Sequence, residues 1–236
     1  MIEVHELTKR FGSRAAVDGV SFTANPGRIT AILGANGAGK TTTLRVLLGL
    51  ARPTAGAATI DGRSYADLPE PLTVVGAVLE ESGVHPSRTA RNHLRALTLS
   101  AGLPTGRVEQ MLALVELAEV SDRRVGRYSL GMRQRLALAA ALLGDPSHLV
   151  LDEPHNGLDP KGTRWLRARL RDFAAEGRTV LIASHLLAEL SEVTDDVVVL
   201  SRGRVVLQAP LQELLGGQRR LEDVFLELTE AMEAAS

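Results

Sequence analysis

One segment of the sequence has the residue types and spacing of a phosphate-binding loop. Residues 34–41 read GANGAGKT, which satisfies the pattern G-x-x-x-x-G-K-[ST]. The glycines allow the backbone to curl, so that several N–H groups can point at one anion. Lys40 can place a cation on the β- and γ-phosphates of a nucleotide, and the Thr41 hydroxyl can ligate Mg²⁺. The candidate phosphate-binding residues are Gly34, Ala35, Asn36, Gly37, Ala38, Gly39, Lys40, Thr41 and Thr42.

This loop needs a buried strand before it and a helix after it, and the sequence predicts both. Residues 29–33 form a short apolar run that leads straight into the loop, and leucines recur on one helical face from Lys40 to about Leu50. A helix in this place adds free N–H groups and its positive end to the loop. The alternative, a Gly-rich turn that matches the pattern by chance, does not account for this context.

A second candidate motif ends in two acids. Residues 148–154, HLVLDEP, read as an apolar strand followed by Asp152 and Glu153. At the end of a parallel strand Asp152 would hold Mg²⁺, directly or through water. Glu153 would point at the γ-phosphate and could polarise an attacking water. The plain alternative is a strand that happens to end in polar residues, and the phosphate loop upstream favours the chemical interpretation.

The remaining pattern predicts an α/β fold with a parallel core. Strands are expected at 57–60, 74–79, 149–151 and 179–183, and a hairpin is expected over 197–207. Helices are expected at 89–99, at 107–117, and from an N-cap at Ser129 to Leu143, and these look like a subdomain inserted into the core. In the second of them, Val108, Met111, Leu112 and Val115 fall on one face at helical spacing. The expected division is a core over 1–79 and 145–215, a helical subdomain over 80–144 and a C-terminal helix over 216–236.

Composition limits the possible functions. Hydrophobic residues make up 44% of the 236 residues and charged residues 23%, as in ordinary folded proteins. The formal charge of -1 provides no basic field for nucleic acid. There is no cysteine, which excludes disulfides, thiolate metal sites and cysteine nucleophiles. The longest uninterrupted apolar run, Leu136 to Leu143, is far shorter than the roughly 20 residues of a membrane span.

Four further segments accompany these motifs in a recognisable order along the chain. YSLGMRQR covers residues 128–135, NGLDP covers 156–160, ASH covers 183–185, and KRFG contains Phe11. The first is similar to a signature whose common form is LSGGQ followed by a basic residue. With these motifs the chain, from Phe11 to about Leu228, resembles the ATP-binding subunit of an ABC transporter. Details such as Leu-Gly-Met in the signature resemble the ABC-2-type, bacitracin- and lantibiotic-exporter branch.

The resemblance implies a P-loop NTPase ABC ATPase fold, with a mainly parallel core sheet, an N-terminal antiparallel β part and an inserted helical subdomain. It implies ATP and Mg²⁺ as ligands, with Glu153, His185 and Lys40 as catalytic residues. In this family Phe11 would stack on adenine, and Asp159 would lie at a subunit interface. Ser129, Gly131 and Met132 would bind the nucleotide held by another subunit. The plain alternatives are an N-cap for Ser129, a structural histidine for His185 and a turn residue for Asp159.

The resemblance also implies partners. One copy of each motif suggests a homodimer, or a pair of nucleotide-binding domains, with two ATP molecules in composite sites. A separate transmembrane permease would hold the pair at the inner, cytoplasmic face of the membrane, and no nucleic acid is expected. The permease is expected to dock on residues 81–93, with Val84 and His85 as the best candidates. The segment 221–229 resembles the ending of exporter ATPases, and could equally be a short helix that packs on its own domain.

Two residues depart from the family pattern. Glu80 stands where glutamine is usual, and a carboxylate there can still ligate Mg²⁺ but adds negative charge near the triphosphate. His155 stands where threonine is usual, and we expect it to be a solvated loop residue.

Three functions fit these observations to different degrees. The leading hypothesis is an ATPase that powers a permease, with export of a drug, peptide or antibiotic. The alternative is an ATP-gated regulator of a membrane complex that transports nothing. An ATP-gated clamp on DNA or ribosomes fits poorly, because such proteins usually carry two nucleotide domains or a long coiled-coil insertion, and because the charge is near neutral.

Overall fold

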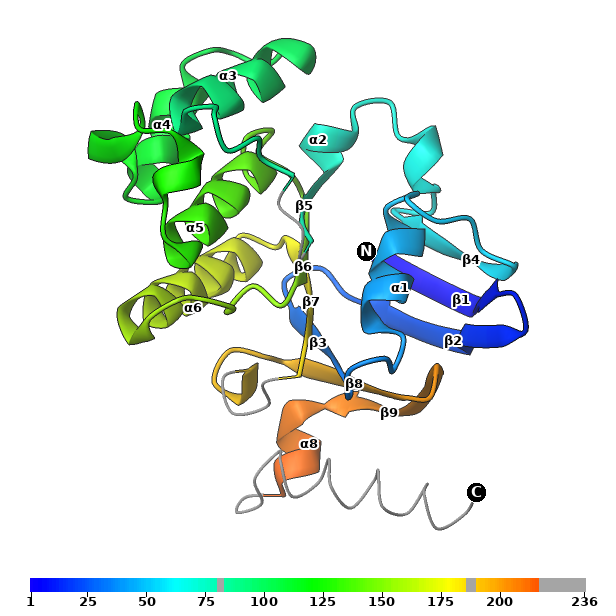
Figure 1. The fold of residues 1–236 in the computed structure, drawn as a ribbon. Coiled ribbons are helices and arrows are strands. Elements are labelled where there is room, and N and C mark those ends of the chain that lie inside the picture. The colour runs from blue at the N-terminus through cyan, green and yellow to red at the C-terminus, as the bar shows by residue number, and fades with distance from the viewer. Residues whose placement is uncertain (80–82, 186–189, 217–236) are drawn as a thin grey trace. The chain divides into compact units, whose positions relative to one another are not determined.

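The computed structural model describes residues 1–79, 83–185 and 190–216 (Figure 1). The chain forms two compact units. The first contains Met1–Leu68 and the chain from Leu170 onward, and the second is Pro69–Arg169. The three-part division expected from the sequence stays a prediction, and the helix expected near 221–228 lies outside the described residues.

An antiparallel sheet forms the N-terminal part of the first unit. Its strands are β1 (Ile2–Phe11), β2 (Arg14–Ala24) and β4 (Ala55–Ile60), in the order β2-β1-β4. A tight turn at Gly12, whose φ is 59°, joins β1 to β2, and the pairing places Phe11 opposite Arg14. The β1–β2 hairpin therefore holds an aromatic and a guanidinium side by side at its end.

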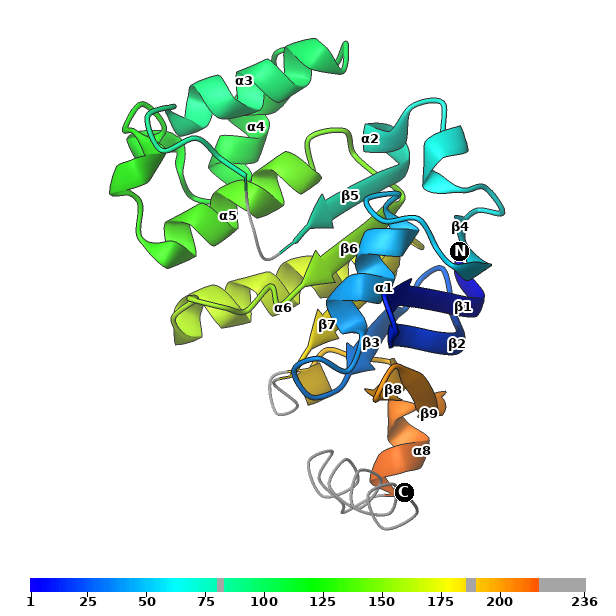
Figure 2. The same ribbon diagram turned by 45° about the vertical axis from the view of Figure 1, so that its right-hand side comes forward.

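The parallel strands of the first unit carry the expected phosphate loop. They are β3 (Ile29–Leu33), β7 (Thr179–Ser184) and β8 (Asp196–Ser201), in the order β7-β3-β8, with β9 (Arg204–Pro210) antiparallel to β8 (Figure 2). Every residue of β3 and β7 is buried, as is typical of parallel strands in α/β proteins. Helices α1 (Lys40–Leu47) and α8 (Leu211–Leu215) and a 3₁₀ turn at Tyr65–Asp67 complete the described part of this unit.

The second unit is mainly helical. Two parallel strands, β5 (Val75–Val78) and β6 (His148–Asp152), pair within it, and α6 (Pro160–Ala175) begins in this unit and ends in the first. Its other elements are α2 (Pro71–Val74), α3 (Ala90–Ser100), α4 (Arg107–Leu114), α5 (Leu130–Ala141) and 3₁₀ turns at Ala118–Val120 and Val125–Arg127.

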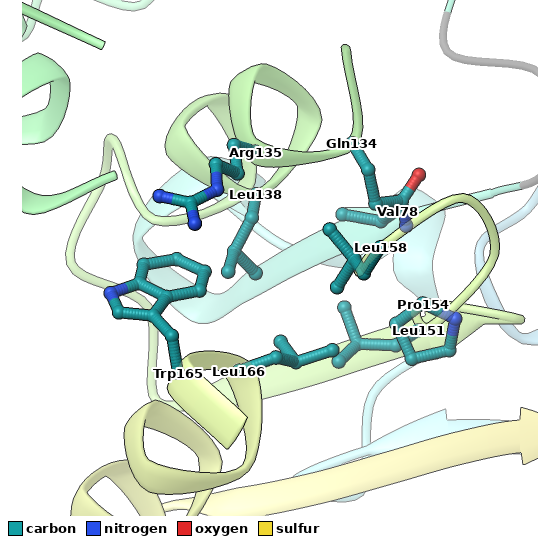
Figure 3. A pocket seen from close by; sticks show the side chains of 9 residues that line it. All are labelled: Val78, Gln134, Arg135, Leu138, Leu151, Pro154, Leu158, Trp165 and Leu166. Atoms are coloured by element: carbon teal, nitrogen blue, oxygen red, sulfur yellow. The ribbon is translucent and has the colours of Figure 1, made fainter. Parts of the chain in front are cut away.

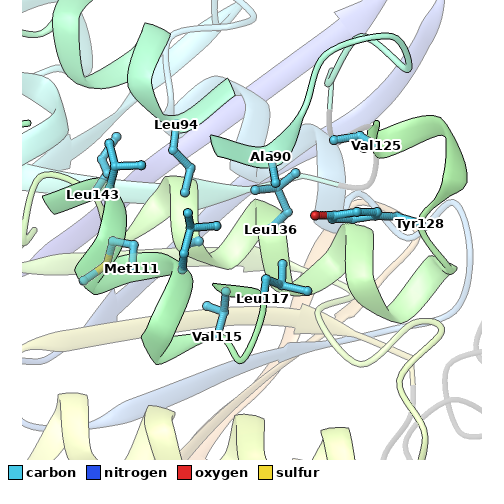
Figure 4. Packing of buried hydrophobic residues seen from close by; sticks show 12 residues of the cluster. Ala90, Leu94, Met111, Val115, Leu117, Val125, Tyr128, Leu136 and Leu143 are labelled. Carbon is cyan, nitrogen blue, oxygen red and sulfur yellow. The ribbon is translucent and has the colours of Figure 1, made fainter. Parts of the chain in front are cut away.

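The core of the second unit lies between α3, α4 and α5 (Figure 4). The apolar face predicted at Val108, Met111, Leu112 and Val115 is buried, which confirms the helical period. Leu94 of α3 and Leu136 of α5 are fully buried in the same cluster. The three helices thus pack together through one continuous cluster of buried apolar side chains.

Helix α4 ends earlier than the apolar pattern suggests. The pattern continues to Leu117, but the helix stops at Leu114, and Glu116 adopts a left-handed φ of 59°. The Leu117 N–H then bonds to the Leu112 carbonyl at 2.9 Å, a helix-ending motif that keeps Leu117 in the core.

Helix α5 begins as predicted and ends earlier. The N-cap predicted at Ser129 is confirmed, because the Ser129 Oγ accepts a hydrogen bond from the Met132 N–H at 3.2 Å. The helix ends at Ala141, two residues before the predicted end at Leu143.

The predicted fold class is confirmed, since the first unit contains an antiparallel β part and parallel strands, and the second contains a helical region and two further parallel strands. Among the residues that the structure describes, no helix combines the length and the apolar character needed to cross a bilayer.

Two leucines of α3 provide a test of this core. Leu94 is fully buried, whereas Leu99 is 61% exposed. Leu94→Ala should lower the free energy of unfolding by about 2–5 kcal/mol, because it removes buried methyl groups and leaves a cavity. Leu99→Ala, on the same helix, should change it by less than about 0.5 kcal/mol. Urea unfolding of both variants measures the difference, and equal losses would contradict the helical core.

Candidate functional site

The loop at residues 34–41 is folded around its own lysine. Gly37 and Gly39 have φ of 83° and 109°, values that L side chains rarely adopt. Lys40 is buried, and its Nζ donates to the carbonyl of Gly34 at 2.7 Å and to that of Ala35 at 3.3 Å. The ammonium is therefore held against the loop by two of the loop's own carbonyls.

Close backbone approach from two other strands fixes the loop from outside. A Cβ at Gly34 would lie 2.5 Å from the Leu200 carbonyl of β8, and one at Gly39 would lie 2.6 Å from the Ala16 carbonyl of β2. The Ala38 carbonyl also accepts from the Gly203 N–H of the β8–β9 turn at 3.0 Å. Neither Gly34 nor Gly39 can be replaced without moving backbone, so the two glycines have a packing role as well as a conformational one.

The start of α1 suits a polyphosphate. Its first-turn N–H groups have no acceptor inside the helix, and they carry the positive end of the helix dipole. Thr43 is buried, and its hydroxyl bonds back to the Gly39 carbonyl at 2.9 Å. Thr41 and Thr42 are only half-buried, so the Thr41 hydroxyl remains accessible as a cation ligand.

Two more candidate site residues, Phe11 and His185, belong to the first unit. Phe11 is 58% exposed, with the Lys9 ammonium 4.9 Å from its ring centroid, and an exposed ring is suited to stacking. His185 is exposed and directly follows β7, whose Ser184 is paired with Leu33, the residue before the loop. The strand register therefore brings His185 to the same edge of the sheet as Gly34.

Sequence reasoning missed Arg14. Its Nη2 lies 3.8 Å from the position that a Cβ on Gly37 would take, which places a guanidinium over the phosphate loop. Arg14 is exposed and forms no ion pair with any other residue that the structure describes. A signal was available, because this arginine follows Phe11 by three residues in a hairpin, but its nearness to the loop depends on the tertiary fold.

The acidic pair lies at the end of β6 in the second unit. Asp152 is 1% exposed, and Glu153 has a left-handed φ of 49°. The Asn156 N–H bonds to the Glu153 carbonyl at 3.1 Å, so a tight turn follows the strand at once. A strained backbone at a glutamate that follows a buried aspartate is typical of functional sites. Glu80 lies outside the described residues.

Thr41 of the first unit and Asp152 of the second unit each offer a hard oxygen ligand, the type that Mg²⁺ prefers. Within residues 1–79, 83–185 and 190–216 there is no cluster of three His, Asp or Glu residues that could hold a metal by protein ligands alone.

The signature residues and Asp159 meet around one cavity of the second unit. The cavity has a volume of about 340 Å³, and its lining includes Ser129, Gly131, Met132 and Asp159. Ser129 caps α5, and the Asp159 carboxylate caps α6 by accepting from the Gly162 N–H at 2.7 Å. Two helix N-termini therefore border the same opening.

A carboxylate also lines this cavity. Glu116 accepts a hydrogen bond from Arg135 at 2.6 Å, and this bond lowers the pKa of Glu116 below its usual range. The Arg135 guanidinium in turn lies 5.0 Å from the Trp165 ring centroid. Arg135 is thus held from two sides and is a fixed part of the cavity wall.

A small apolar pocket lies behind the loop at 156–159 (Figure 3). Leu158 extends into it from the loop, toward Leu166 of α6 and Pro154. The space left over is about 10 Å³, no more than a single water would need. The lining residues are Val78, Gln134, Arg135, Leu138, Leu151, Pro154, Leu158, Trp165 and Leu166.

The expectation that His155 is a solvated loop residue is wrong. Its side chain is 4% exposed, because the turn after Glu153 directs it into the second unit. Burial lowers the pKa of His155 to about 4, with a further lowering by the charge of Arg167, and the charge of Glu153 opposes this change. The ring is therefore neutral at physiological pH.

This burial predicts a pH-dependent stability. In the unfolded chain His155 takes up a proton near pH 6.5, whereas the folded protein does so only near pH 4. Stability should therefore be complete above pH 6.5 and fall as the pH drops toward 4, by a total on the order of 3 kcal/mol. His155→Gln should lose this share of the pH dependence in urea unfolding at pH 7.5 and 5. The exposed His5→Gln is the control, and an unchanged slope in His155→Gln would refute the assignment.

Comparison with known proteins identifies the family. A sequence model described as "ABC transporter" matches residues 17–156. The lantibiotic transport ATP-binding protein SrtF of Streptococcus pyogenes is 32% identical over 225 residues, which cover 95% of this chain and 96% of that protein. The bacitracin transport ATP-binding protein BcrA of Bacillus licheniformis is 37% identical over 223 residues, or 93% of this chain and 73% of that protein.

Solved structures agree in fold. An ATP-binding subunit of an ABC transporter matches with a TM-score of 0.87 and 30% identity over 97% of this chain and 99% of that one. The dimeric cassette MJ0796, in a post-hydrolysis state with ADP and Pi, matches with a TM-score of 0.80 and 25% identity over 89% and 99%. With its phosphate loop, acidic strand end and signature cavity, this chain belongs to the ABC transporter family and is one of its ATP-binding, ATP-hydrolysing subunits.

Proposed function

We propose that this protein hydrolyses Mg·ATP to power a separate membrane permease that exports a drug, peptide or antibiotic. The observation that carries the proposal is the phosphate loop, with the Lys40 ammonium fixed by two loop carbonyls beneath the N-terminus of α1. Export and the class of cargo are supported by relatives that are described as transport proteins for lantibiotics and bacitracin.

The first unit would bind the nucleotide. Lys40 and the N–H groups of the loop and of the first turn of α1 would hold the β- and γ-phosphates and stabilise charge that develops during hydrolysis. Phe11 would stack on adenine, since its ring is exposed beside the loop-facing Arg14, which would add a cation to the phosphates. His185 would contact the γ-phosphate from the end of β7.

The second unit would supply the acids. Glu153 would act as the general base toward water, and its partial exposure leaves it room to do so. Asp152 and Thr41 would hold Mg²⁺, which neutralises phosphate charge when bound. Glu80 as a further ligand rests on the resemblance alone.

We propose that the working form is a pair of cassettes with composite sites. The N-terminal end of α5 would contact the nucleotide that is held by the phosphate loop of a second copy, through Ser129, Gly131 and Met132. Asp159 would lie against the same nucleotide. The cavity at the N-terminus of α5 supports this role, because a helix N-terminus carries the positive end of the helix dipole, which favours an anion. The dimeric state of the solved cassettes supports it as well.

The permease would place this subunit at the cytoplasmic face of the membrane, and the near-neutral charge supports a protein partner over nucleic acid. Of the two docking candidates, Val84 is half-buried and packs against the helical core, whereas His85 is exposed. His85 is therefore the better candidate for direct contact, and its Nδ1 is 2.7 Å from the Ser87 hydroxyl.

Glu153→Gln tests the catalytic base. Losing the base should reduce Mg²⁺-dependent ATP hydrolysis by at least about a hundredfold while leaving ATP binding intact. The variant should then accumulate as an ATP-bound dimer, detectable by light scattering. Glu119→Gln, at an exposed position, is the matched control. Hydrolysis by Glu153→Gln at the wild-type rate would show that Glu153 is not the base.

Lys40→Ala tests the phosphate loop. Removing the ammonium deletes a charge that is fixed against the loop, and should weaken ATP binding by about tenfold or more, since a charge-assisted contact is worth about 1.5–3 kcal/mol. Arg45→Ala removes an exposed cation from the last turn of the same helix and should have little effect. Equilibrium binding of a fluorescent ATP analogue measures both, and equal affinities would remove Lys40 from the site.

A further inference from the structure

The start of α5 and the loop at 156–159 are interlocked through two glycines. A Cβ on Gly157 would lie 2.3 Å from both Cγ and Cδ2 of Leu130, and 2.9 Å from its Cβ. A Cβ on Gly131 would lie 2.9 Å from the Gly157 carbonyl oxygen. Each segment therefore occupies the space that a side chain of the other would need.

The same loop is fixed on its other side. Leu158 inserts into the apolar pocket of Figure 3, and Asp159 caps α6 through the Gly162 N–H at 2.7 Å. Gly157 has a φ of 76° at the point between these contacts, and Leu130 covers it while remaining 55% exposed. Because the Leu130 side chain is more than half exposed, it is not part of the hydrophobic core. Its contact with Gly157 accounts for an apolar residue at this position.

We propose that Leu130 is a positioning residue, which sets the distance between the signature end of α5 and the loop that carries Asp159. This inference rests on the proposed composite site, because Gly131 and Asp159 line the same cavity and would act on one nucleotide. Leu130 itself need not touch that nucleotide. A displacement of about 1 Å at such a site can lower turnover about a hundredfold, so a spacer of fixed size has a catalytic effect.

A substitution pair tests this contact. Gly157→Ala places a methyl group where Leu130 lies, and should force the two segments apart. Leu130→Gly removes all three clashing atoms, so the double variant regains the space. Gly177→Ala is the matched control, because Gly177 has a similar φ of 83° with nothing within 4 Å of an added Cβ. It carries the same conformational penalty without the clash.

The measurements are kcat and KM for ATP, ATP-dependent dimerisation in the Glu153→Gln background, and hydrogen exchange of residues 129–133 without nucleotide. Relative to Gly177→Ala, Gly157→Ala should lower kcat by about tenfold or more, weaken dimerisation and speed exchange at residues 129–133. Leu130→Gly alone should lower kcat by about threefold, because the spacer is lost. The double variant should match Leu130→Gly to within about twofold, because the clash is gone, and a Leu130→Gly variant with wild-type turnover would overturn the positioning role.

The outcomes separate the inference from the proposed function. ATP hydrolysis and dimerisation by the chain with its native loop bear on the proposed function only. The inference is overturned if Gly157→Ala matches Gly177→Ala in turnover and in exchange at 129–133, or if Leu130→Gly brings no recovery. The hydrogen-exchange measurement tests the contact between Leu130 and Gly157 even in a preparation that hydrolyses no ATP.

Discussion

Backbone packed directly against backbone is the constraint on which this structure depends. Around the phosphate loop, whose Gly34 carbonyl accepts from the Lys40 ammonium, strand β8 approaches Gly34 and strand β2 approaches Gly39 more closely than any side chain would permit. The strands around the loop therefore constrain its shape. Such preorganisation matters for phosphate chemistry, since the protein contributes chiefly position and fixed charge.

The second unit uses the same means at its signature end. Gly131 lies under the Gly157 carbonyl and Gly157 lies under Leu130, so the caps of α5 and α6 are held at a fixed spacing around one cavity. In both units glycine serves where two backbones meet, and in both a helix N-terminus faces the opening. The starts of α1 and α5 are thus both fixed by close approach of neighbouring chain segments to glycine.

Much of the fold could be predicted because its signals are local. The buried strand at Ile29–Leu33, the Ser129 N-cap and the apolar face of α4 each depend on residues close together in the chain, and each is confirmed. The end of α4 was misjudged, since Leu117 continues the apolar pattern after the chain has left the helix. A hydrophobic period reports burial, and a residue can stay buried beyond the last helical turn.

For this protein the sequence alone determined the chemistry: a phosphate loop, an acidic strand end and a signature segment, because their residue types and spacing are local properties. The tertiary structure decided which side chains face which space. It brought Arg14 over Gly37, buried His155 and seated Leu130 on Gly157. None of these contacts has a local signal, because each joins a residue to a partner whose position is fixed by strand register and by the turns between elements.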